Sequence, residues 1–350
     1  MKDDAIQVLR AVLGEHLPWH GARLNLLAQF LLALLQVRSV NLAEIATAFS
    51  GKAQMASHYK RLQRFFRGFE IDFDTLARLL VRLFGVGEGP WYLTLDRTNW
   101  KLGKAEINLL VLGIAHQGMA LPVMWQVLNK AGNSNTKERI ALMQRFLKCF
   151  GSGRIKALLA DREFAGEDWF RWLQAQHIPF HIRLRENTQI PNVWNRPIPA
   201  KAMFRSLQVG QYRHLEGRRP IWGCFVHLSA LRLEDGGLLI ISSDAPQQQA
   251  FSAYRRRWDI ETLFGALKSR GFDLEATHMT HPDRLKKLFG LLALAFAWSL
   301  RTGVQLVRQK PIEVKKLSNV RSDPASAMAS ISSGMSSSTL PISGRISYGC

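Results

Sequence analysis

Two aspartates in this sequence each follow an apolar run and precede an arginine. Asp96 closes WYLTLD (91–96) and leads into DRTNW, and Asp161 closes IKALLAD (155–161) and leads into DREF. A sheet can aim carboxylates rigidly at strand ends, and carboxylate oxygens suit Mg²⁺. Two such ions about 4 Å apart can activate an attacking oxygen and stabilise a leaving one at a phosphodiester. An aspartate after a strand is also a common turn or N-cap residue, so neither motif decides the matter alone.

A third carboxylate, Glu261, lies in the mostly cationic stretch YRRRWDIETLFGALK (254–268). If this stretch is one continuous helix, four side chains fall within about a 60° arc: Tyr254, Arg257, Glu261 and Lys268. The neighbouring apolar face, with Ile260, Leu263, Phe264 and Leu267, is suited to packing on a sheet. Arg and Tyr donate well to phosphate oxygens, and Lys supplies a point charge, so the row could follow a nucleic-acid backbone. The alternative is a solvated face stabilised by an i,i+4 ion pair between Arg257 and Glu261.

The composition favours a polyanionic partner. The chain has 350 residues, 47% of them hydrophobic, and 47 Lys and Arg against 27 Asp and Glu, for a formal charge of +20. A chain of this size can bury a sizeable core in two or three domains, and the excess charge favours nucleic acid or an anionic membrane surface. The most apolar run, 288–300, is shorter than the roughly 20 residues of a membrane span, so we expect a buried helix and no membrane partner. A structural basic protein, such as a ribosomal one, is the alternative that charge alone leaves open.

The cysteines and the N-terminus favour a cytoplasmic protein. Cys149, Cys224 and Cys350 are far apart and lack metal-ligand spacing, which argues against zinc fingers or a disulfide scaffold. The N-terminus, MKDDAIQ, is acidic and is followed by no signal-peptide core.

Residues 1–86 are predicted to be helical. Apolar periodicity predicts helices at 24–37, 41–49 and 56–66. The last two, on either side of Gly51, could form a helix-turn-helix whose second helix carries Lys60, Arg61 and Arg64. A solvated basic face is the alternative interpretation.

From residue 87 the pattern predicts a mixed α/β sheet. Strands are expected at 91–96, 107–116, 121–128, 155–161 and 179–185, with helices at 136–150 and 167–176. Residues 186–245 break this rhythm and end in a hairpin around EDGG, so they are interpreted as a β-rich insertion. The glutamate helix and an apolar helix at 285–307 follow, and the Ser-rich segment 311–350 is predicted to be disordered.

The spacing Tyr254, Arg257, Glu261, Lys268 resembles the Y-(2)-R-(3)-E-(6)-K signature of DDE transposases of bacterial insertion sequences, in the family named after insertion sequence four. The contexts LDRTNW and ADREF are similar to that family's two aspartate motifs, and the resemblance covers about 90–300. It implies an α/β fold with an RNase H-like mixed-sheet catalytic core at 87–185 and 246–310. A β-rich insertion at 186–245 would interrupt this core, and a helical DNA-binding region at 1–86 would precede it.

The same resemblance implies roles for the site residues. Asp96, Asp161 and Glu261 would hold two Mg²⁺ ions, with Mn²⁺ able to substitute and Asp96 bridging, while Tyr254, Arg257 and Lys268 would contact DNA phosphates. The expected enzyme binds the terminal inverted repeats of its own element in double-stranded DNA, nicks the ends, and joins the freed 3′-OH to target DNA. A homodimer in the synaptic complex and a location at the cytoplasmic nucleoid are also implied.

One departure from the family lies in the β-rich insertion. Relatives that cut through a DNA hairpin stack a flipped base on a tryptophan close before the glutamate helix, where this chain has EDGGLLIISSD. The nearest candidates are Trp222, a possible base-stacking residue, and Trp194, and core packing is the alternative role for both. Two further functions stay open: a catalytically idle DNA-binding regulator derived from a transposase, and a structure-selective nuclease of the same core fold.

Overall fold

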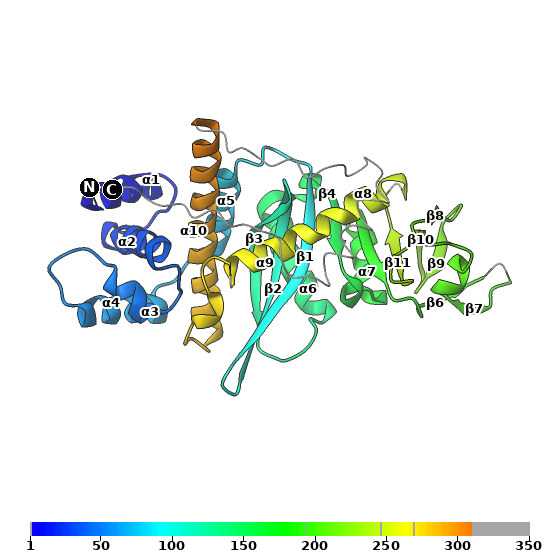
Figure 1. The fold of residues 1–350 in the computed structure, drawn as a ribbon, viewed down its shortest axis with the longest axis horizontal. Helices are drawn as coiled ribbons and strands as arrows, with labels where there is room; N and C mark the ends of the chain where they lie inside the picture. The colour runs from blue at the N-terminus through cyan, green and yellow to red at the C-terminus, as the bar shows by residue number, and fades with distance from the viewer. Residues whose placement is uncertain (1, 193, 246, 269, 310–350) are drawn as a thin grey trace.

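The computed structural model describes residues 2–309 except 193, 246 and 269. The segment predicted to be a disordered tail, 311–350, lies outside the described residues. Figure 1 shows helices at the N-terminal end, a large sheet in the middle and small strands at the far end, with the long helix α10 (Pro282–Gln309) between the first helices and the sheet.

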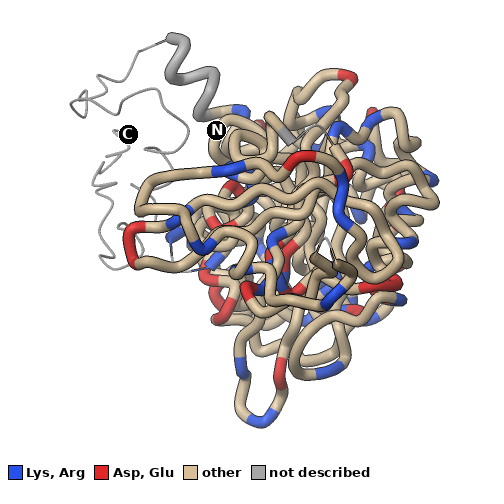
Figure 2. The backbone as a smooth tube through the Cα atoms, turned by 90° about the vertical axis from the view of Figure 1, so that its right-hand side faces the viewer, with Lys and Arg blue, Asp and Glu red and all other residues tan. Residues whose placement is uncertain are grey.

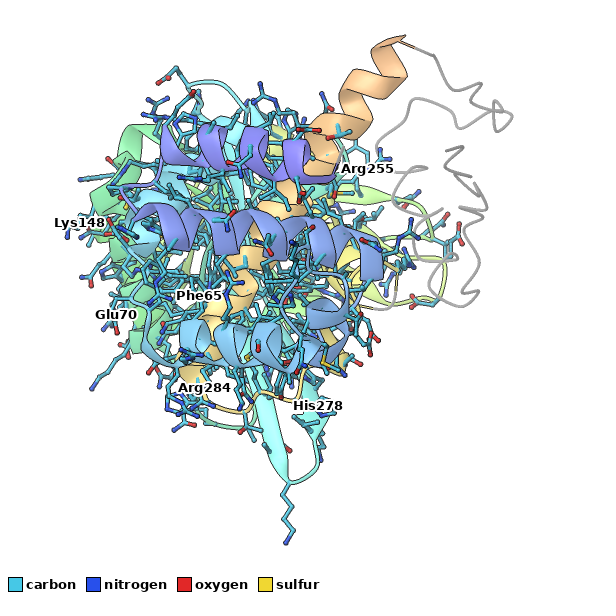
Figure 3. All side chains as sticks on the ribbon, turned by 90° about the vertical axis from the view of Figure 1, so that its left-hand side faces the viewer. Phe65, Glu70, Lys148, Arg255, His278 and Arg284 are labelled. Atoms are coloured by element: carbon cyan, nitrogen blue, oxygen red, sulfur yellow. The ribbon has the colours of Figure 1, made fainter. Side chains whose placement is uncertain are left out.

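The N-terminal region is helical, as predicted, and it has five helices among the described residues: α1 (Lys2–Gly14), α2 (Gly21–Val37), α3 (Leu42–Thr47), α4 (Met55–Gly68) and α5 (Phe73–Phe84). Polar side chains define where two of them begin. Asn41 Oδ1 accepts from Ala43 N at 2.9 Å before α3, and Asp72 Oδ1 accepts from Asp74 N at 3.0 Å before α5. Figure 3 shows α1 to α4 lying across one side of the molecule, and Lys287 Nζ of α10 donates to Phe66 O of α4 at 3.2 Å.

The central sheet is mixed, as predicted. Its strand order in the described part of the chain is β3-β2-β1-β4-β5-β11-β10-β8, with β9 paired to β10 at the edge. β1 is antiparallel to β2 and parallel to β4, and β4 is parallel to β5. The bounds of the first five strands are β1 (Trp91–Leu102), β2 (Ala105–His116), β3 (Met119–Leu128), β4 (Ile155–Ala160) and β5 (Phe180–Leu184). This arrangement is consistent with an RNase H-like core.

Asp96 does not end its strand, and the expectation that it closes WYLTLD was wrong. β1 continues to Leu102 because its pairing with β2 runs on as far as Leu102 opposite Ala105. The pairing between β1 and β4 does end beside Asp96, because its last pair is Leu95 opposite Ala160. Asp96 and Asp161 are therefore the next residues along two parallel neighbouring strands.

Four α-helices and two 3₁₀ turns complete the core: α6 (Thr136–Phe150), η2 (Arg162–Phe164), α7 (Glu167–Ala175), α8 (Ala250–Arg255), η5 (Arg256–Trp258) and α9 (Asp259–Leu267). The stretch 254–268 was expected to be one helix, and this was wrong. The 3₁₀ turn separates α8 from α9, and Arg257, at its centre, is buried. A 3₁₀ turn has about 3.0 residues per turn rather than 3.6, so the predicted straight row of side chains is displaced.

Apolar packing holds α9 and α10 on the sheet. Ile260, Leu263 and Leu267 are buried, as their spacing predicted, and α9 crosses the front of the sheet in Figure 1. The run 288–300 forms part of α10 and is largely buried, again as predicted. A Cβ on Gly290 would lie 2.9 Å from Leu76 Cδ2 and 3.0 Å from Trp125 Cζ2, so α10 needs glycine where it meets α5 and β3. No helix in the described part of the chain is long and apolar enough to cross a membrane.

The segment 186–245 is rich in short strands: its last four extend the central sheet, and its first two form a separate pair. The strands are β6 (Gln189–Pro191), β7 (Pro197–Pro199), β8 (Tyr212–His214), β9 (Arg219–Ile221), β10 (Cys224–Arg232) and β11 (Leu238–Ser243). β10 and β11 form the predicted antiparallel hairpin, and β11 also pairs with β5.

The two tryptophans of this segment have different environments. Trp222 is half-buried and packs on Phe170 with ring centroids 5.5 Å apart, which matches the core-packing interpretation. Trp194 is 76% exposed, so core packing is wrong for this residue.

Buried His181 gives the fold a pH dependence that can be measured. Burial lowers the pKa of His181, on β5, to about 4, and its Nδ1 lies 2.8 Å from Ser243 Oγ. Unfolded histidine has a pKa of about 6.5, so the unfolded chain binds an extra proton between about pH 6.5 and 4, and stability falls as the pH falls. We expect wild-type unfolding free energy to drop by about 2 kcal/mol more than that of His181→Asn between pH 7 and 4.5. Denaturant titrations at both pH values test this; equal drops would contradict it.

Candidate active site

Arg257 lies between two of the three predicted carboxylates. Its Nη1 is 3.4 Å from Asp96 Oδ2, and its Nη2 donates to Glu261 Oε1 at 2.7 Å. The two carboxylate oxygens therefore lie within roughly 9 Å of each other, because one guanidinium is only about 2 Å across. The i,i+4 pair between Arg257 and Glu261 exists, but it is not a solvated one, since the Arg257 side chain is 7% exposed.

The third carboxylate joins this cluster through a buried phenol. Asp161 directly precedes η2 but makes no capping hydrogen bond there, so the turn or N-cap role does not account for it. Its Oδ1 instead accepts from Tyr254 OH at 3.3 Å and lies 3.8 Å from Arg183 Nη1. Burial raises the pKa of Tyr254, which keeps the phenol neutral and able to donate.

Arg257 stays charged although it is buried. Burial alone would lower the pKa of its guanidinium, but the surrounding phenol and carboxylates, with Asp161 among them, more than offset this and raise it. The Nε of Arg257 and the Nε of Arg183 are buried and have no hydrogen-bond partner among the described residues. The site therefore holds cationic donors with unused hydrogen-bonding capacity beside three carboxylates.

Asp96 is a half-buried carboxylate with too little compensating charge. Burial raises its pKa to about 6, although the Arg257 cation and a hydrogen bond from Arg97 N at 2.7 Å act in the opposite direction. Glu163 and Asp161 raise the pKa further by adding negative charge nearby. A cation beside Asp96 would supply the missing compensation and favour the ionised form.

Lys268 lies at the end of α9, beside the continuation of β1. Its Nζ donates to Asn99 O at 3.2 Å, pairs with Glu275 Oε1 at 2.8 Å, and lies 5.7 Å from the centroid of the Trp100 ring. The signature residues thus make intramolecular contacts with the two aspartate-bearing segments, rather than forming one solvent-facing row.

The other predicted site residues lie elsewhere. Lys60 and Arg64 are exposed on α4 and Arg61 is half-buried there, on the other side of α10 from the sheet (Figure 1). Figure 2 shows basic residues distributed over the whole described chain, so those on α4 are not a unique concentration of charge. Trp222 packs on α7 and takes no part in the carboxylate cluster.

The donor set suits a hard divalent cation. Asp96, Asp161 and Glu261 offer carboxylate oxygens only, the ligands that Mg²⁺ prefers, and the pKa of Asp96 stays raised although Arg257 lies beside it. Among the described residues, however, no three side chains of metal-ligating type already lie together as one ion site. Arg257 is placed between Asp96 and Glu261, so a bound ion would share these two carboxylates with its guanidinium.

Three residues of this site were missed in the sequence. Arg97 and Glu163 are the neighbours of the two aspartates in LDRTNW and ADREF, and they form an ion pair at 2.8 Å. The arginine that follows each aspartate could have drawn attention to Arg97, whereas no sequence pattern pointed to Glu163. Arg183, in the buried strand FHIRL, could have been noted as a charge on an otherwise apolar strand.

Comparison with known proteins identifies the family. A family model described as the transposase DDE domain matches residues 84–298, more than half of the chain. Among curated proteins, none matches the chain. The matched range contains both aspartate motifs, the Arg257 cluster and the strands and helices that position them. The chain therefore belongs to the transposase DDE domain family.

Proposed function

We propose that this protein is the transposase of an insertion sequence in the family named after insertion sequence four. It binds the terminal inverted repeats of its own element in double-stranded DNA and catalyses divalent-metal-dependent strand cleavage and strand transfer. The observation that carries the proposal is the convergence of Asp96, Asp161 and Glu261 around Arg257 and Tyr254. These residues come from three distant parts of the chain, and the ion pairs and hydrogen bonds join them in one cluster.

Asp96, Asp161 and Glu261 are proposed as the residues that hold two Mg²⁺ ions, with Mn²⁺ as a substitute. When bound, such ions polarise a scissile phosphate and make a water or a 3′-OH more nucleophilic. The sheet and α9 fix the orientation of the three carboxylates. The chain also supplies the cations Arg257 and Lys268 for the phosphates of the terminal DNA.

The helices of residues 1–86 are proposed as a DNA-binding region, with Lys60, Arg61 and Arg64 toward the backbone. Phosphate contacts of this kind position a protein on DNA without reading its sequence. We further propose that two copies act together in the synaptic complex, because a transposition event must bring two ends to one place.

Cleavage of the DNA next to the gene tests the proposal. A plasmid carrying the gene with its chromosomal flanks, incubated with the purified protein and Mg²⁺, should be cut at inverted sequences that bound the gene. EDTA should abolish the cuts. Cutting at scattered sites without regard to those sequences would favour a structure-selective nuclease instead. Binding without cutting in both Mg²⁺ and Mn²⁺ would favour the idle regulator.

A further inference from the structure

The two aspartate motifs are joined by an ion pair that the cluster around Arg257 does not include. Arg97 directly follows Asp96, and Glu163 follows Asp161 by two positions. Arg97 Nε lies 2.8 Å from Glu163 Oε1, and Arg97 Nη2 donates to Glu163 Oε2 at 3.0 Å. This is a two-point contact between a planar guanidinium and a carboxylate, which fixes orientation as well as distance.

The same guanidinium extends the connection to β2 and to the segment after β3. Arg97 Nη1 donates to Asn108 Oδ1 at 3.1 Å, and Nη2 donates to Asn133 Oδ1 at 3.0 Å. Asn108 is buried, and its Nδ2 donates to Lys130 O at 3.1 Å and to Gly132 O at 2.8 Å. Arg97 therefore contacts three separate segments at once.

A second arginine holds the other partner in place. Arg139, buried in α6, donates from Nη2 to Glu163 O at 3.0 Å and from Nε to Ser134 Oγ at 2.9 Å. The backbone of η2 is thereby attached to α6, while its Glu163 side chain is attached to β1. Both partners of the ion pair are fixed by further hydrogen bonds, so neither is a loose surface charge.

The location of this pair follows from the sheet register. Pairing between β1 and β4 ends at Leu95 and Ala160, so Asp96 and Asp161 lie beyond the last backbone connection between their strands. Arg97 and Glu163 are the next side-chain connection across this gap among the described residues. Without them, the separation of the two aspartates would depend on contacts made through α8, η5 and α9.

We propose that Arg97 and Glu163 form a clamp that sets the spacing of Asp96 and Asp161 for divalent-ion binding. They are positioning residues, because they act through the aspartates and do not touch the reacting phosphate. The proposal rests on the proposed function. It adds two residues outside the Y-(2)-R-(3)-E-(6)-K signature to those that divalent-ion binding requires. Arginine is needed because lysine supplies only a point charge and cannot make the two-point contact.

Metal affinity separates this role from a merely stabilising one. Ion pairs that are open to solvent contribute little to stability, whereas breaking a mostly buried one is destabilising. The side chains of Arg97 and Glu163 are only 13% and 22% exposed, so thermal unfolding has to be measured beside metal affinity. Residues that orient metal ligands typically change metal affinity or activity by about 10- to 100-fold when they are replaced.

The test compares Glu163→Gln and Arg97→Lys with Asp74→Asn. The control breaks another partly buried ion pair, between Asp74 and Arg145, 3.6 Å apart, which joins α5 to α6 away from the site. Mn²⁺ binding to the DNA-free protein is followed by the electron paramagnetic resonance signal of free Mn²⁺. Cleavage of the plasmid carrying the gene and its flanks is measured in parallel, and thermal unfolding reports on stability.

We expect Glu163→Gln and Arg97→Lys to weaken Mn²⁺ binding by about tenfold and to slow cleavage by about tenfold or more. All three variants should stay folded at the assay temperature, and Asp74→Asn should bind Mn²⁺ and cleave as the wild type does. Wild-type Mn²⁺ affinity in both clamp variants would overturn the proposal while leaving the proposed function intact. A wild-type protein that binds no Mn²⁺ would overturn the proposed function, and the clamp's role with it.

Discussion

Replacing Glu261 by glutamine is expected to abolish strand cleavage while DNA binding stays within a few-fold of the wild type. The substitution keeps the size of the side chain and its hydrogen-bonding contact with Arg257, but it removes the negative charge that a divalent ion requires. The Glu261 side chain is 43% exposed, so its replacement should not unfold α9. Single-turnover cleavage of the end DNA in Mg²⁺ should fall by at least about 10³-fold.

Glu275→Gln is the matched control for this experiment. Glu275 is also a half-exposed carboxylate paired with a cation of the signature, since its Oε1 lies 2.8 Å from Lys268 Nζ. Its replacement removes the same charge at a position outside the cluster, so cleavage should persist. Gel-shift titrations of both variants measure binding. Undiminished cleavage by Glu261→Gln would refute a metal-ligand role for Glu261.

The parts of the fold that follow from local sequence pattern were predictable. Buried strands such as 155–161 and the hairpin around EDGG are marked by apolar runs and turn residues that few other structures would accommodate. The buried face of α9 follows from helical spacing in the same way. That Asp161 lies at a strand end could also be predicted, because β4 is short and ends with its pairing.

The geometry of the site was less predictable, because distant parts of the chain determine it. Nothing local indicates that β1 continues past Asp96, since the continuation depends on pairing with β2. The 3₁₀ turn at η5 likewise accompanies the inward placement of Arg257 between Asp96 and Glu261. Glu261 is only four positions away along the chain, but Asp96 is 161 positions away. Helical spacing could place Arg257 next to Glu261, but it could not show that Arg257 would also contact Asp96.

The location of Arg257 changes what the signature arginine is expected to do. Its guanidinium lies where positive charge is needed to hold Asp96 and Glu261 close together, the same electrostatic task that a divalent ion would perform. A bound ion and the guanidinium would therefore compete for these carboxylates, because two cations held by the same carboxylates repel each other. A guanidinium released by an ion would be free to contact a DNA phosphate.

This competition predicts an unusual pair of effects for Arg257→Met, which keeps an unbranched apolar stem but removes the guanidinium and its charge. In the absence of DNA, the variant should bind Mn²⁺ about tenfold or more tightly than the wild type, because the competing cation is gone. In Ca²⁺, its DNA affinity should depend less steeply on salt, with a slope lower by about one unit. In EDTA the slope should equal that of the wild type, because the guanidinium is then held by Asp96 and Glu261.

Arg255→Gln provides the comparison for Arg257→Met, since Arg255 is an exposed arginine two positions away and outside the cluster. It should leave Mn²⁺ binding unchanged. The sign of the effect at Arg257 separates two physical roles. If Arg257 only orients Asp96 and Glu261 as metal ligands, its loss should weaken Mn²⁺ binding by about 10- to 100-fold. Weaker Mn²⁺ binding by Arg257→Met would therefore refute the competition between guanidinium and ion, and a lower salt slope in EDTA would show that Arg257 contacts DNA without being displaced.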